Sequence, residues 1–275
     1  MTMYASIDSN AFNRIRAWLN KRCGMHYPEK KQELLQQRLM RVCQTQKFSN
    51  LAELANAVEN LDLHELHSLV IDAASTNHTY FFREPQVLDY FRDTILPTLS
   101  KDDVRIWSAA ASTGDEAYTL AIIVAEAKGM EWAKNNLSIL GTDISTYVIP
   151  YAELAIYRQT ALEHTSPEIL KRYFESAGDG QYRVNKQIRN LCTFRNMNLK
   201  TNPYPFTQLF DVVFCRNVLY YFDEVHQQEI IEHIYDVTKD GGWLLTSVTV
   251  SLRHLKTRWI NVGAGIYRKD VNHVY

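Results

Sequence analysis

The sequence predicts an α/β protein with a doubly wound sheet, preceded by a small all-helical domain. Two observations lead to this prediction. From Val104 onward, short apolar segments alternate with segments of helical periodicity, which is typical of a parallel or mixed sheet with helices on both faces. Residues 1–75 show only helical periodicity. We therefore expect two domains, residues 1–75 and residues 76–275, and with 46% hydrophobic side chains the larger one can bury a sizeable core.

Residues 1–75 contain four segments with the apolar spacing of amphipathic helices, at 11–22, 30–44, 51–58 and 63–74. Gly24 suits the C-terminal end of the first of them. On the second, Lys31, Arg38 and Arg41 fall on one stripe, because offsets of seven and three residues return side chains to nearly the same azimuth. A stripe of this kind is suited to binding acidic groups.

The basic residues are concentrated at the N-terminal end. Residues 1–50 carry nine Lys or Arg and three acidic residues, a net charge of about +6, whereas residues 51–75 carry five acids and no Lys or Arg. Because the basic character is local, it does not indicate a nucleic-acid-binding chain. It favours an acidic protein surface as the partner, although a solvated helical face without any partner explains it about equally well.

Several classes of protein are disfavoured by composition. The apolar runs are too short to span a bilayer, and the N-terminus lacks a signal-peptide pattern. The four cysteines form no C-x-x-C pair, which argues against a zinc knuckle or a disulfide framework. His64 and His67 lie three residues apart, but no further cluster of ligand-type residues accompanies them, so we expect no metal site. We expect a cytoplasmic monomer that is not inserted into a membrane.

The alternation in residues 76–275 predicts individual elements. Core strands are expected at 104–107, 138–142, 210–215 and 243–248, and helices at 86–91, 116–128, 147–155, 162–174 and 227–238. Gly241-Gly242 is expected to form the turn before the last of these strands, and Gly265–Arg268 a final strand. Residues 178–194 are expected to form a small antiparallel β-subdomain that leads into a further core strand ending near Asn198.

Small or polar residues follow the expected strands at four places: Ser108–Glu116, Asp143, Asn198-Leu199 and Arg216-Asn217. Ligands of open α/β sheets bind at the carboxyl ends of the strands, so these residues predict one ligand site. A further segment, residues 75–84, is polar at its front and aromatic in its middle. If its aromatic side chains pack on the core, its polar groups would be well placed to hold a ligand.

The residues at these strand ends indicate a class of cofactor. Asp143 is an acid at the end of the second strand, where a carboxylate commonly accepts hydrogen bonds from ribose hydroxyls. The first loop has one glycine, Gly114, and does not form the G-x-G-x-x-G pattern that cradles a pyrophosphate. Glu116 would repel phosphate and attract a cation, which favours S-adenosylmethionine. In the alternative interpretation, Asp115 and Glu116 only complement a helix N-terminus.

The motifs STNHTYFFRE, IWSAAASTGDEAYTLA, LGTDIS, FRNMNL and FDVVFCRNVLYYF resemble, in order and spacing, those of the CheR-type chemotaxis receptor glutamate methyltransferases. The resemblance covers essentially the whole chain, including the basic helical N-terminal domain. It implies a Rossmann-like methyltransferase domain that binds S-adenosylmethionine and releases S-adenosylhomocysteine. It also implies methyl transfer to glutamate side chains on the cytoplasmic helices of methyl-accepting chemotaxis receptors, in chemotaxis adaptation and signal transduction.

The resemblance assigns roles to individual residues of this chain. The family's cofactor contacts fall on Asn77, Thr79, Arg83, Glu116, Asp143, Asn198, Leu199, Arg216 and Asn217. Its receptor-facing arginines resemble Arg38 and Arg41, and its inserted β-subdomain resembles the excursion at residues 178–194. Arg83 and Tyr221 are the expected catalytic residues: Arg83 would orient the incoming carboxylate, and Tyr221 would wall the methyl-transfer site. Arg83 could instead pair with Glu84 or with a helix end.

The sequence departs from the family at a few positions, and these departures leave alternatives open. Thr246–Val250 replaces the glycine-and-acid motif expected after the fifth strand, which puts the final hairpin in doubt. Ala117 stands where the family usually has proline, and the short loop at Ser176–Gln181 favours receptors without a peptide tail. One alternative is a cofactor-binding but catalytically impaired receptor or signalling adaptor. A small-molecule methyltransferase would leave the basic helices unexplained, and a dehydrogenase is disfavoured by the glycine-poor loop.

Overall fold

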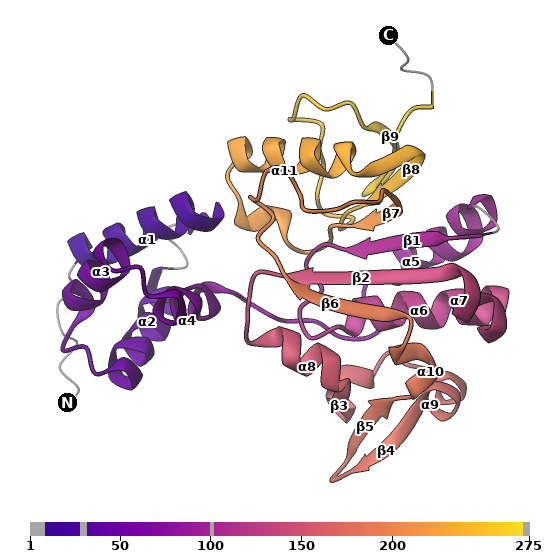
Figure 1. Ribbon diagram of the computed structural model, residues 1–275, viewed down its shortest axis with the longest axis horizontal. Helices are drawn as coiled ribbons and strands as arrows, with labels where there is room; N and C mark the ends of the chain where they lie inside the picture. The colour runs from indigo at the N-terminus through magenta and orange to yellow at the C-terminus, as the bar shows by residue number, and fades with distance from the viewer. Residues whose placement is uncertain (1–8, 28–31, 100–101, 272–275) are drawn as a thin grey trace. The chain divides into compact units, whose positions relative to one another are not determined.

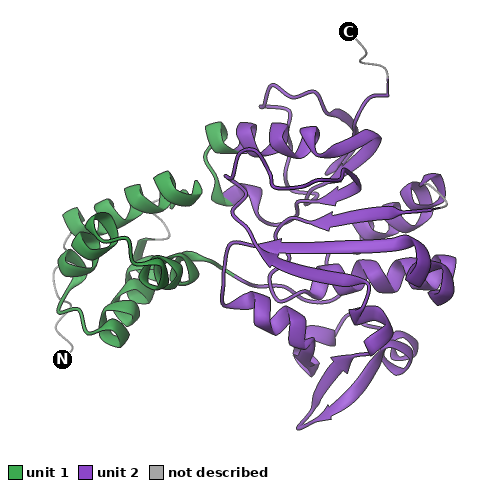
Figure 2. Cartoon of the chain, in the orientation of Figure 1, with its two compact units in different colours: residues 1–76, 221–226 green, residues 77–220, 227–275 purple. Residues whose placement is uncertain are grey.

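The computed structural model describes residues 9–27, 32–99 and 102–271, which divide into two compact units (Figure 2). The helical unit comprises residues 1–76 together with 221–226, and the α/β unit comprises residues 77–220 and 227–275. The short segment at 221–226 therefore belongs to the helical unit although the α/β unit flanks it on both sides in sequence. Among the described residues, no helix combines the length and the apolar character that crossing a membrane requires.

The described residues of the helical unit form α1 (Ser9–Cys23), α2 (Gln32–Gln46), α3 (Leu51–Asn60) and α4 (His64–Ala74), together with the start of α11 (Glu224–Asp236). Their apolar faces form the core of the unit through the fully buried side chains of Ile15, Leu19, Leu35, Leu39 and Leu54. Helix α3 begins with a reciprocal cap, because Asn50 Oδ1 accepts from Glu53 N at 3.0 Å while Glu53 Oε2 accepts from Ser49 N at 2.7 Å. The four predicted helices are confirmed, with boundaries shifted by a few residues.

The α/β unit is built on a seven-stranded sheet (Figure 1) in the order β6-β2-β1-β7-β8-β10-β9. The strands are β1 (Val104–Ser108), β2 (Leu137–Asp143), β6 (Cys192–Asn196), β7 (Phe210–Phe214), β8 (Thr238–Leu245), β9 (Ile260–Gly263) and β10 (Ile266–Arg268). The first five run parallel to one another. Strand β10 pairs antiparallel with β8, and β9 pairs antiparallel with β10. From β1 the strand order runs outward in both directions, so the fold is doubly wound and its switch point lies between β1 and β7.

Helices and short helical turns connect these strands. They are α5 (Pro85–Tyr90), the π-helical turn η2 (Phe91–Ile95), the 3₁₀ turn η3 (Leu96–Thr98), α6 (Asp115–Lys128), α7 (Met130–Asn136), α8 (Val148–Leu154), the 3₁₀ turn η5 (Leu219–Tyr221) and α11 (Glu224–Asp236). Helix α6 is buried at ten of its fourteen positions. A helix that is apolar around most of its circumference is one that protein surrounds. The loop that precedes α6 is therefore held on a rigid element.

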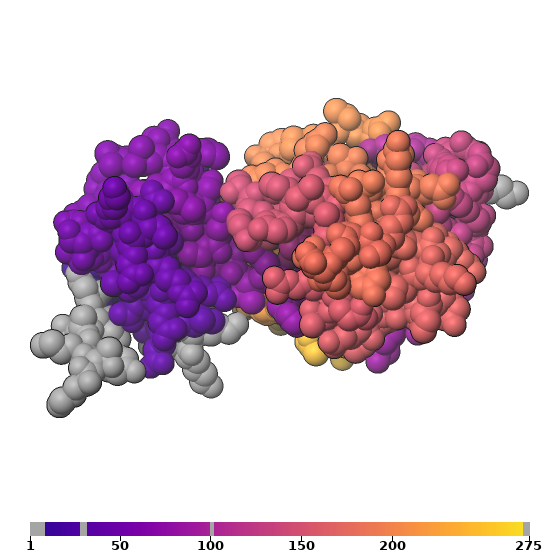
Figure 3. All heavy atoms as spheres, turned by 90° about the horizontal axis from the view of Figure 1, so that it is seen from below, coloured from indigo at the N-terminus to yellow at the C-terminus, as the bar shows by residue number. Residues whose placement is uncertain are grey.

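A second, three-stranded antiparallel sheet has the order β3-β5-β4 and consists of β3 (Ile156–Arg158), β4 (Phe174–Gly178) and β5 (Gln181–Val184). The 3₁₀ turn η4 (Gln159–Leu162) and α9 (Pro167–Tyr173) lie between β3 and β4, where one helix was expected. The chain from α8 to β6 reaches the surface in the pink and orange part of Figure 3. Whether this region selects receptors without a peptide tail stays a prediction.

The small sheet differs from the expectation of a β-subdomain at residues 178–194. Only β5 and the end of β4 lie in that range, and β3 begins some twenty residues earlier in the chain. The chain leaves the small sheet at Asn185, directly after β5. Asn185 Oδ1 accepts from Ile188 N at 3.0 Å and thereby caps the short helix α10 (Lys186–Arg189). The following strand, β6, pairs in parallel with β2 and belongs to the large sheet.

The expected turn at Gly241-Gly242 is wrong, because both glycines lie inside β8. The pairing of β7 with β8 shifts register between Phe210 and Val212, and this irregularity accommodates the glycines within the strand. A Cβ on Gly242 would lie 2.7 Å from Thr238 Cγ2, 2.8 Å from Lys239 O and 2.9 Å from Asp211 O. Glycine is therefore required here by close backbone approach rather than by a turn.

We expect Gly242→Ala to destabilise the α/β unit by about 1–3 kcal/mol, because an added methyl group at this position forces backbone or side-chain shifts. Gly263→Ala is the matched control, since a Cβ there would meet nothing closer than 3.8 Å and the residue also lies in a strand. Chemical denaturation of both variants measures the difference. Equal stability of the two variants would contradict the steric explanation.

The final hairpin forms despite the altered Thr246–Val250 segment. Strands β9 and β10 pair antiparallel, β10 pairs with β8, and Thr246 N donates to Gly265 O at 2.7 Å. The positive φ of Gly265, 71°, allows the turn between the two strands. The doubt that the sequence raised about this hairpin is thereby removed.

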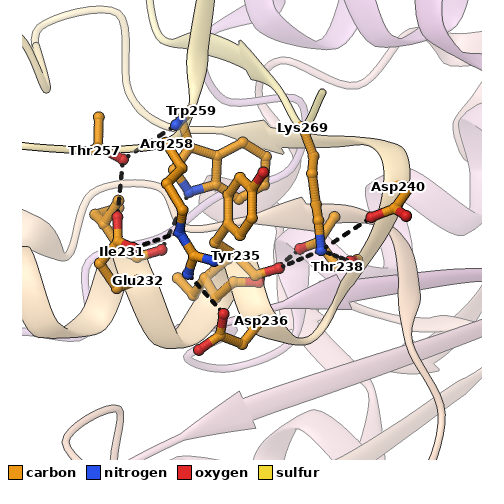
Figure 4. Close-up of polar contacts among 11 residues, drawn as sticks. Ile231, Glu232, Tyr235, Asp236, Thr238, Asp240, Thr257, Arg258, Trp259 and Lys269 are labelled. Carbon is orange, nitrogen blue, oxygen red and sulfur yellow. Dashed lines mark hydrogen bonds and ion pairs between the residues drawn. The ribbon is translucent and has the colours of Figure 1, made fainter. Parts of the chain in front are cut away.

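Polar contacts fasten the segment between β8 and β9 to helix α11 (Figure 4). The Arg258 guanidinium lies 3.9 Å from the centre of the Tyr235 ring and forms ion pairs with Glu232 and Asp236 at 2.8 and 2.6 Å. Trp259 Nε1 donates to the carbonyl of Ile231 at 3.1 Å. These contacts fix the far end of a segment whose beginning, at Ser247, lies at the carboxyl ends of the parallel strands.

Candidate functional site

The loop after β1 is held by the ends of the two neighbouring strands. Ala109 N donates to Phe214 O of β7 at 2.8 Å, and Ala111 N donates to Thr142 O of β2 at 2.9 Å. Ser112 and Gly114 have positive φ values of 49° and 91°, which turn the chain sharply into α6. The small-residue loop predicted from the sequence is therefore a fixed turn at the switch point of the sheet.

Asp143, at the end of β2, joins this loop to the segment that precedes the sheet. Its Oδ2 accepts from Ser112 N at 2.9 Å, its Oδ1 accepts from Ser145 N at 3.0 Å, and the carboxylate is buried. Ser112 Oγ in turn donates to Asn77 O at 3.3 Å. A carboxylate only accepts hydrogen bonds, so Asp143 at this strand end is suited to groups that donate, such as ligand hydroxyls.

Asn198 and Leu199 follow β6 on the same side of the sheet. Met197 N donates to Asp143 O at 2.9 Å, which places the start of this turn against the end of β2. Asn198 Oδ1 accepts from Lys200 N at 2.9 Å, and the Leu199 carbonyl accepts from the Tyr204 hydroxyl at 2.8 Å. The turn is thus ordered by its own hydrogen bonds, and the Leu199 side chain is buried.

Arg216, directly after β7, is the centre of a second polar cluster. Its side chain is 2% exposed, and Nη1 lies 2.9 Å from Glu116 Oε2. Nη2 donates to the carbonyl of Arg83 at 2.5 Å and lies 3.5 Å from Glu84 Oε2. Glu116 also accepts from Ser108 Oγ at 2.7 Å. The charge of Glu116 is therefore balanced by a buried guanidinium, a pairing that the sequence did not indicate.

The segment from Asn77 to Glu84 is anchored by Phe81, as its aromatic pattern suggested. Phe81 is fully buried, and its ring makes edge contacts with Tyr157 and Phe174. Arg83 follows the anchor, and its Nη1 donates to His78 O at 2.8 Å. Among the ion pairs of the described residues, none joins Arg83 to Glu84. Thr79 is half-buried in the same segment.

The expected receptor-facing arginines lie on α2 in the helical unit. Arg38 Nη1 donates to the carbonyls of Ala73 and Ser75 at 3.3 and 2.8 Å, so it fastens the end of α4. Both arginines line an open cavity of about 310 Å³, together with Val42, Thr45, Asp72, Ala73 and Ser75. Lys31, the third residue of the predicted stripe, lies outside the described residues.

Tyr221, the second predicted catalytic residue, belongs to the helical unit, where its carbonyl accepts from His26 N at 2.6 Å. Its catalytic role stays a prediction.

One buried acid beside the site predicts a pH dependence of stability. Burial raises the pKa of Asp115 to about 6, while a hydrogen bond from Thr113 Oγ1 at 2.6 Å opposes the shift. Because the folded pKa exceeds the unfolded one, ionised Asp115 costs stability above pH 6, and the cost disappears as the pH falls from about 6 towards 4.

We expect Asp115→Asn to stabilise the protein by about 2–3 kcal/mol at pH 8, because the neutral amide avoids burial of a charge and still accepts from Thr113. The gain should fall to about 1 kcal/mol at pH 4.5 and to near zero at about pH 3, where Asp115 is protonated in both states. Denaturation curves of the unaltered protein and of Asp115→Asn at each pH value measure the difference in their free energies of unfolding. A difference that does not change with pH would contradict the explanation.

Comparison with known proteins identifies the family of the chain. The family model "CheR methyltransferase, SAM binding domain" matches residues 77–267, and "CheR methyltransferase, all-alpha domain" matches residues 10–73. The chain belongs to the CheR methyltransferase family. The resemblance noted in the motifs is thereby confirmed, and the chain is an S-adenosylmethionine-dependent methyltransferase with an all-helical N-terminal part.

Curated relatives of the CheR family cover nearly the whole chain. A chemotaxis protein methyltransferase of Borreliella burgdorferi is 31% identical over 259 residues and covers 90% of each protein. Chemotaxis protein methyltransferase 1 of Pseudomonas aeruginosa is 34% identical over 251 residues, covering 89% of this chain and 91% of the relative. The chemotaxis protein methyltransferase of Escherichia coli is 30% identical over 274 residues, covering 97% and 93%.

The residues of this CheR methyltransferase fit its cofactor. Two buried polar atoms at the strand ends, Arg216 Nε and Ser145 Oγ, have no hydrogen-bond partner in the described part of the protein. Unsatisfied buried groups of this kind are costly unless a ligand or water pairs with them. The buried carboxylate of Asp143 is suited to ribose hydroxyls, and the first loop provides a single glycine in place of a pyrophosphate cradle. In the described residues, no group of three or more His, Cys, Asp or Glu side chains could hold a metal ion.

Three further residues contact the predicted site residues. Glu84 contacts Arg216 and Asn217, Ser112 binds Asp143 through its backbone, and the Ser247 hydroxyl accepts from Asn217 N at 2.9 Å. Ser112 and Glu84 lie inside segments that the sequence placed at the ligand site, but no individual role was predicted for either. The contacts of Glu84 and Ser247 with Asn217 span 133 and 30 residues, so no local pattern indicates them.

Proposed function

We propose that this protein is a protein-glutamate O-methyltransferase that methylates glutamate side chains on the cytoplasmic helices of bacterial chemoreceptors. The match to both parts of the CheR family carries the proposal, because a methyltransferase for small molecules would not need a helical domain whose first fifty residues are strongly basic. Such a role places the enzyme in the cytoplasm and makes it part of chemotaxis adaptation.

The chemistry requires positioning rather than a general base. A glutamate with a pKa near its reference value of about 4.3 is ionised at neutral pH. Bound S-adenosylmethionine supplies a methyl group on a sulfonium, which a carboxylate oxygen displaces to give a methyl ester and S-adenosylhomocysteine. The task of the protein is to align the carboxylate with the methyl group and to exclude water. Arg83 would orient the carboxylate, since a guanidinium binds a carboxylate through two parallel hydrogen bonds. Tyr221 would form one side of the methyl-transfer site.

The cofactor would lie along the carboxyl ends of the parallel strands. Asp143 is suited to the ribose hydroxyls, and the cluster of Glu116, Arg216 and Asn217 is suited to the charged methionine end. Asn77, Thr79, Arg83, Asn198 and Leu199 complete the proposed contacts. The support for this set is that Asn77, Ser112 and Asp143 are joined by hydrogen bonds, and that Arg216 joins Glu116 to the backbone of Arg83.

The receptor would bind to helix α2 through Arg38 and Arg41. Acidic side chains on the receptor helices are suitable partners for the cavity that these arginines line. Since Arg38 also holds the backbone at the end of α4, its loss would affect the helical unit as well as binding. Arg41→Glu is therefore the sharper variant for testing the receptor contact.

Transfer of labelled methyl groups from S-adenosylmethionine to receptor cytoplasmic fragments tests the function. We expect incorporation that base releases, because a carboxyl methyl ester is base-labile, and no incorporation into a fragment whose helix glutamates are replaced by alanine. Calorimetric titration with S-adenosylmethionine measures cofactor binding separately from methyl transfer. Cofactor binding without transfer would instead support the adaptor, and base-stable incorporation would contradict a glutamate acceptor.

A further inference from the structure

Glu84 and Asn217 contact each other although 133 residues separate them in the chain. Asn217 Nδ2 donates to Glu84 Oε1 at 2.8 Å. Both residues have a left-handed backbone, with φ values of 54° and 56°, which residues other than glycine rarely adopt. Such conformations persist where the surrounding structure enforces them, and they concentrate at functional sites.

The contact fixes which way the Asn217 amide faces. An ionised carboxylate only accepts hydrogen bonds, so the group of Asn217 that faces Glu84 must be the NH₂. The amide oxygen, Oδ1, is then directed away from Glu84 and stays an acceptor. The backbone of Asn217 is held as well, because its N–H donates to Ser247 Oγ at 2.9 Å. Asn217 is thus fixed at two points.

Glu84 keeps its negative charge at neutral pH. Burial alone would raise the pKa of Glu84, but the Asn217 amide, the Arg216 guanidinium and the backbone N–H of Val248 outweigh burial and lower it. Taken together, Glu84, Glu116 and Arg216 carry two negative charges and one positive charge. The cluster therefore retains a net charge of about −1, which favours a cationic group close to Asn217.

We propose that Glu84 is a positioning residue for the cofactor: it orients the Asn217 amide so that Oδ1 accepts a hydrogen bond from the ammonium group at the methionine end of the cofactor. This inference rests on the proposed contact of Asn217 with the cofactor. It assigns to Glu84 a role that differs from that of Arg83, its neighbour in the chain, which faces the substrate carboxylate in the proposed function.

Titration calorimetry of the full chain with S-adenosylhomocysteine tests the inference. We expect Glu84→Ala and Asn217→Ala each to weaken binding roughly 10- to 100-fold, since each removes or misdirects a charge-assisted hydrogen bond. The loss in the double variant should be clearly smaller than the sum of the two single losses, because Glu84 acts in part through Asn217. A purely structural role of Glu84 would instead give additive losses. Denaturation curves without ligand show whether each variant folds.

A reversed pair keeps the test decisive if Glu84→Ala does not fold. Asn217→Asp alone should bind poorly, because two carboxylates then face each other. Adding Glu84→Gln supplies an amide donor in the opposite direction, restores the net charge and again leaves an acceptor oxygen directed at the ligand. We expect the reversed pair to regain at least roughly tenfold in affinity over Asn217→Asp.

The possible outcomes separate this inference from the proposed site. If Asn217→Ala binds S-adenosylhomocysteine as the unaltered protein does, the proposed Asn217 contact fails. If Asn217→Ala binds weakly but Glu84→Ala does not, if the losses are additive, or if the reversed pair recovers nothing, the role of Glu84 is overturned. Because the readout is cofactor binding, failure to methylate glutamate would leave this test unaffected.

Discussion

Replacing Arg216 by alanine should destabilise the α/β unit and abolish measurable cofactor binding. The side chain is 2% exposed and pairs with Glu116 at 2.9 Å and with Glu84 at 3.5 Å. Its removal leaves two carboxylates in a buried site without their cation, and loss of one partner from a buried ion pair costs about 3–5 kcal/mol. The carbonyl of Arg83 also loses its donor. Chemical denaturation and calorimetric titration with S-adenosylhomocysteine measure the two effects.

Arg92→Ala is the matched control for this prediction. Arg92 also pairs with two carboxylates, Asp89 at 2.8 Å and Asp93 at 2.7 Å, but its side chain is 47% exposed. Ion pairs of exposed residues contribute little to stability. We expect this variant to unfold at nearly the same denaturant concentration as the unaltered protein and to bind the cofactor normally. Similar behaviour of the two variants would mean that burial of Arg216 does not determine its effect.

The parts of the fold that depend on local patterns could be predicted from the sequence. Apolar segments bounded by small or polar residues located β1, β2 and β7, and therefore also the site at their carboxyl ends. The acid at the end of β2, Asp143, was found in the same way. These features depend on side-chain periodicity and on the rule that ligands bind at strand ends, and neither requires knowledge of distant contacts.

The parts that depend on distant pairing could not be predicted. Strand β3 has three residues, too few for a periodic pattern, and it exists because it pairs with β5. Gly241 and Gly242 have the composition of a turn, yet the irregular pairing with β7 places them in a strand. Glu84 is the last residue of the motif STNHTYFFRE, but only the fold brings it to Asn217.

Arg216 shows how a residue can be singled out from a motif while its contacts are missed. The motif after β7 identified Arg216 as a cofactor residue, and Glu116 was expected to attract the cationic part of the cofactor. In the structure the two side chains pair with each other, and the remaining negative charge comes from Glu84. The electrostatic preference for a cation therefore belongs to the whole cluster, which no single motif describes.

Arg83→Ala should abolish methyl transfer while leaving the fold intact. The Arg83 guanidinium donates to the carbonyl of His78 at 2.8 Å and lies 5.7 Å from the centre of the Tyr80 ring. In the described part of the chain no carboxylate forms an ion pair with it, so it remains available for the substrate glutamate. Misplacing that carboxylate should lower kcat/KM at least roughly 100-fold, because transfer depends on alignment with the methyl group. Labelled methyl transfer to a receptor fragment measures the loss.

Two further measurements decide how Arg83 acts. Arg83→Lys keeps the charge but cannot form two parallel hydrogen bonds, so we expect it to recover only part of the activity. Repeating the assay of Arg83→Ala at saturating cofactor distinguishes orientation of the substrate from binding of the cofactor, because added cofactor restores transfer only if binding is what was lost. Undiminished transfer by Arg83→Ala would remove Arg83 from the reaction and would leave orientation of the glutamate to another side chain.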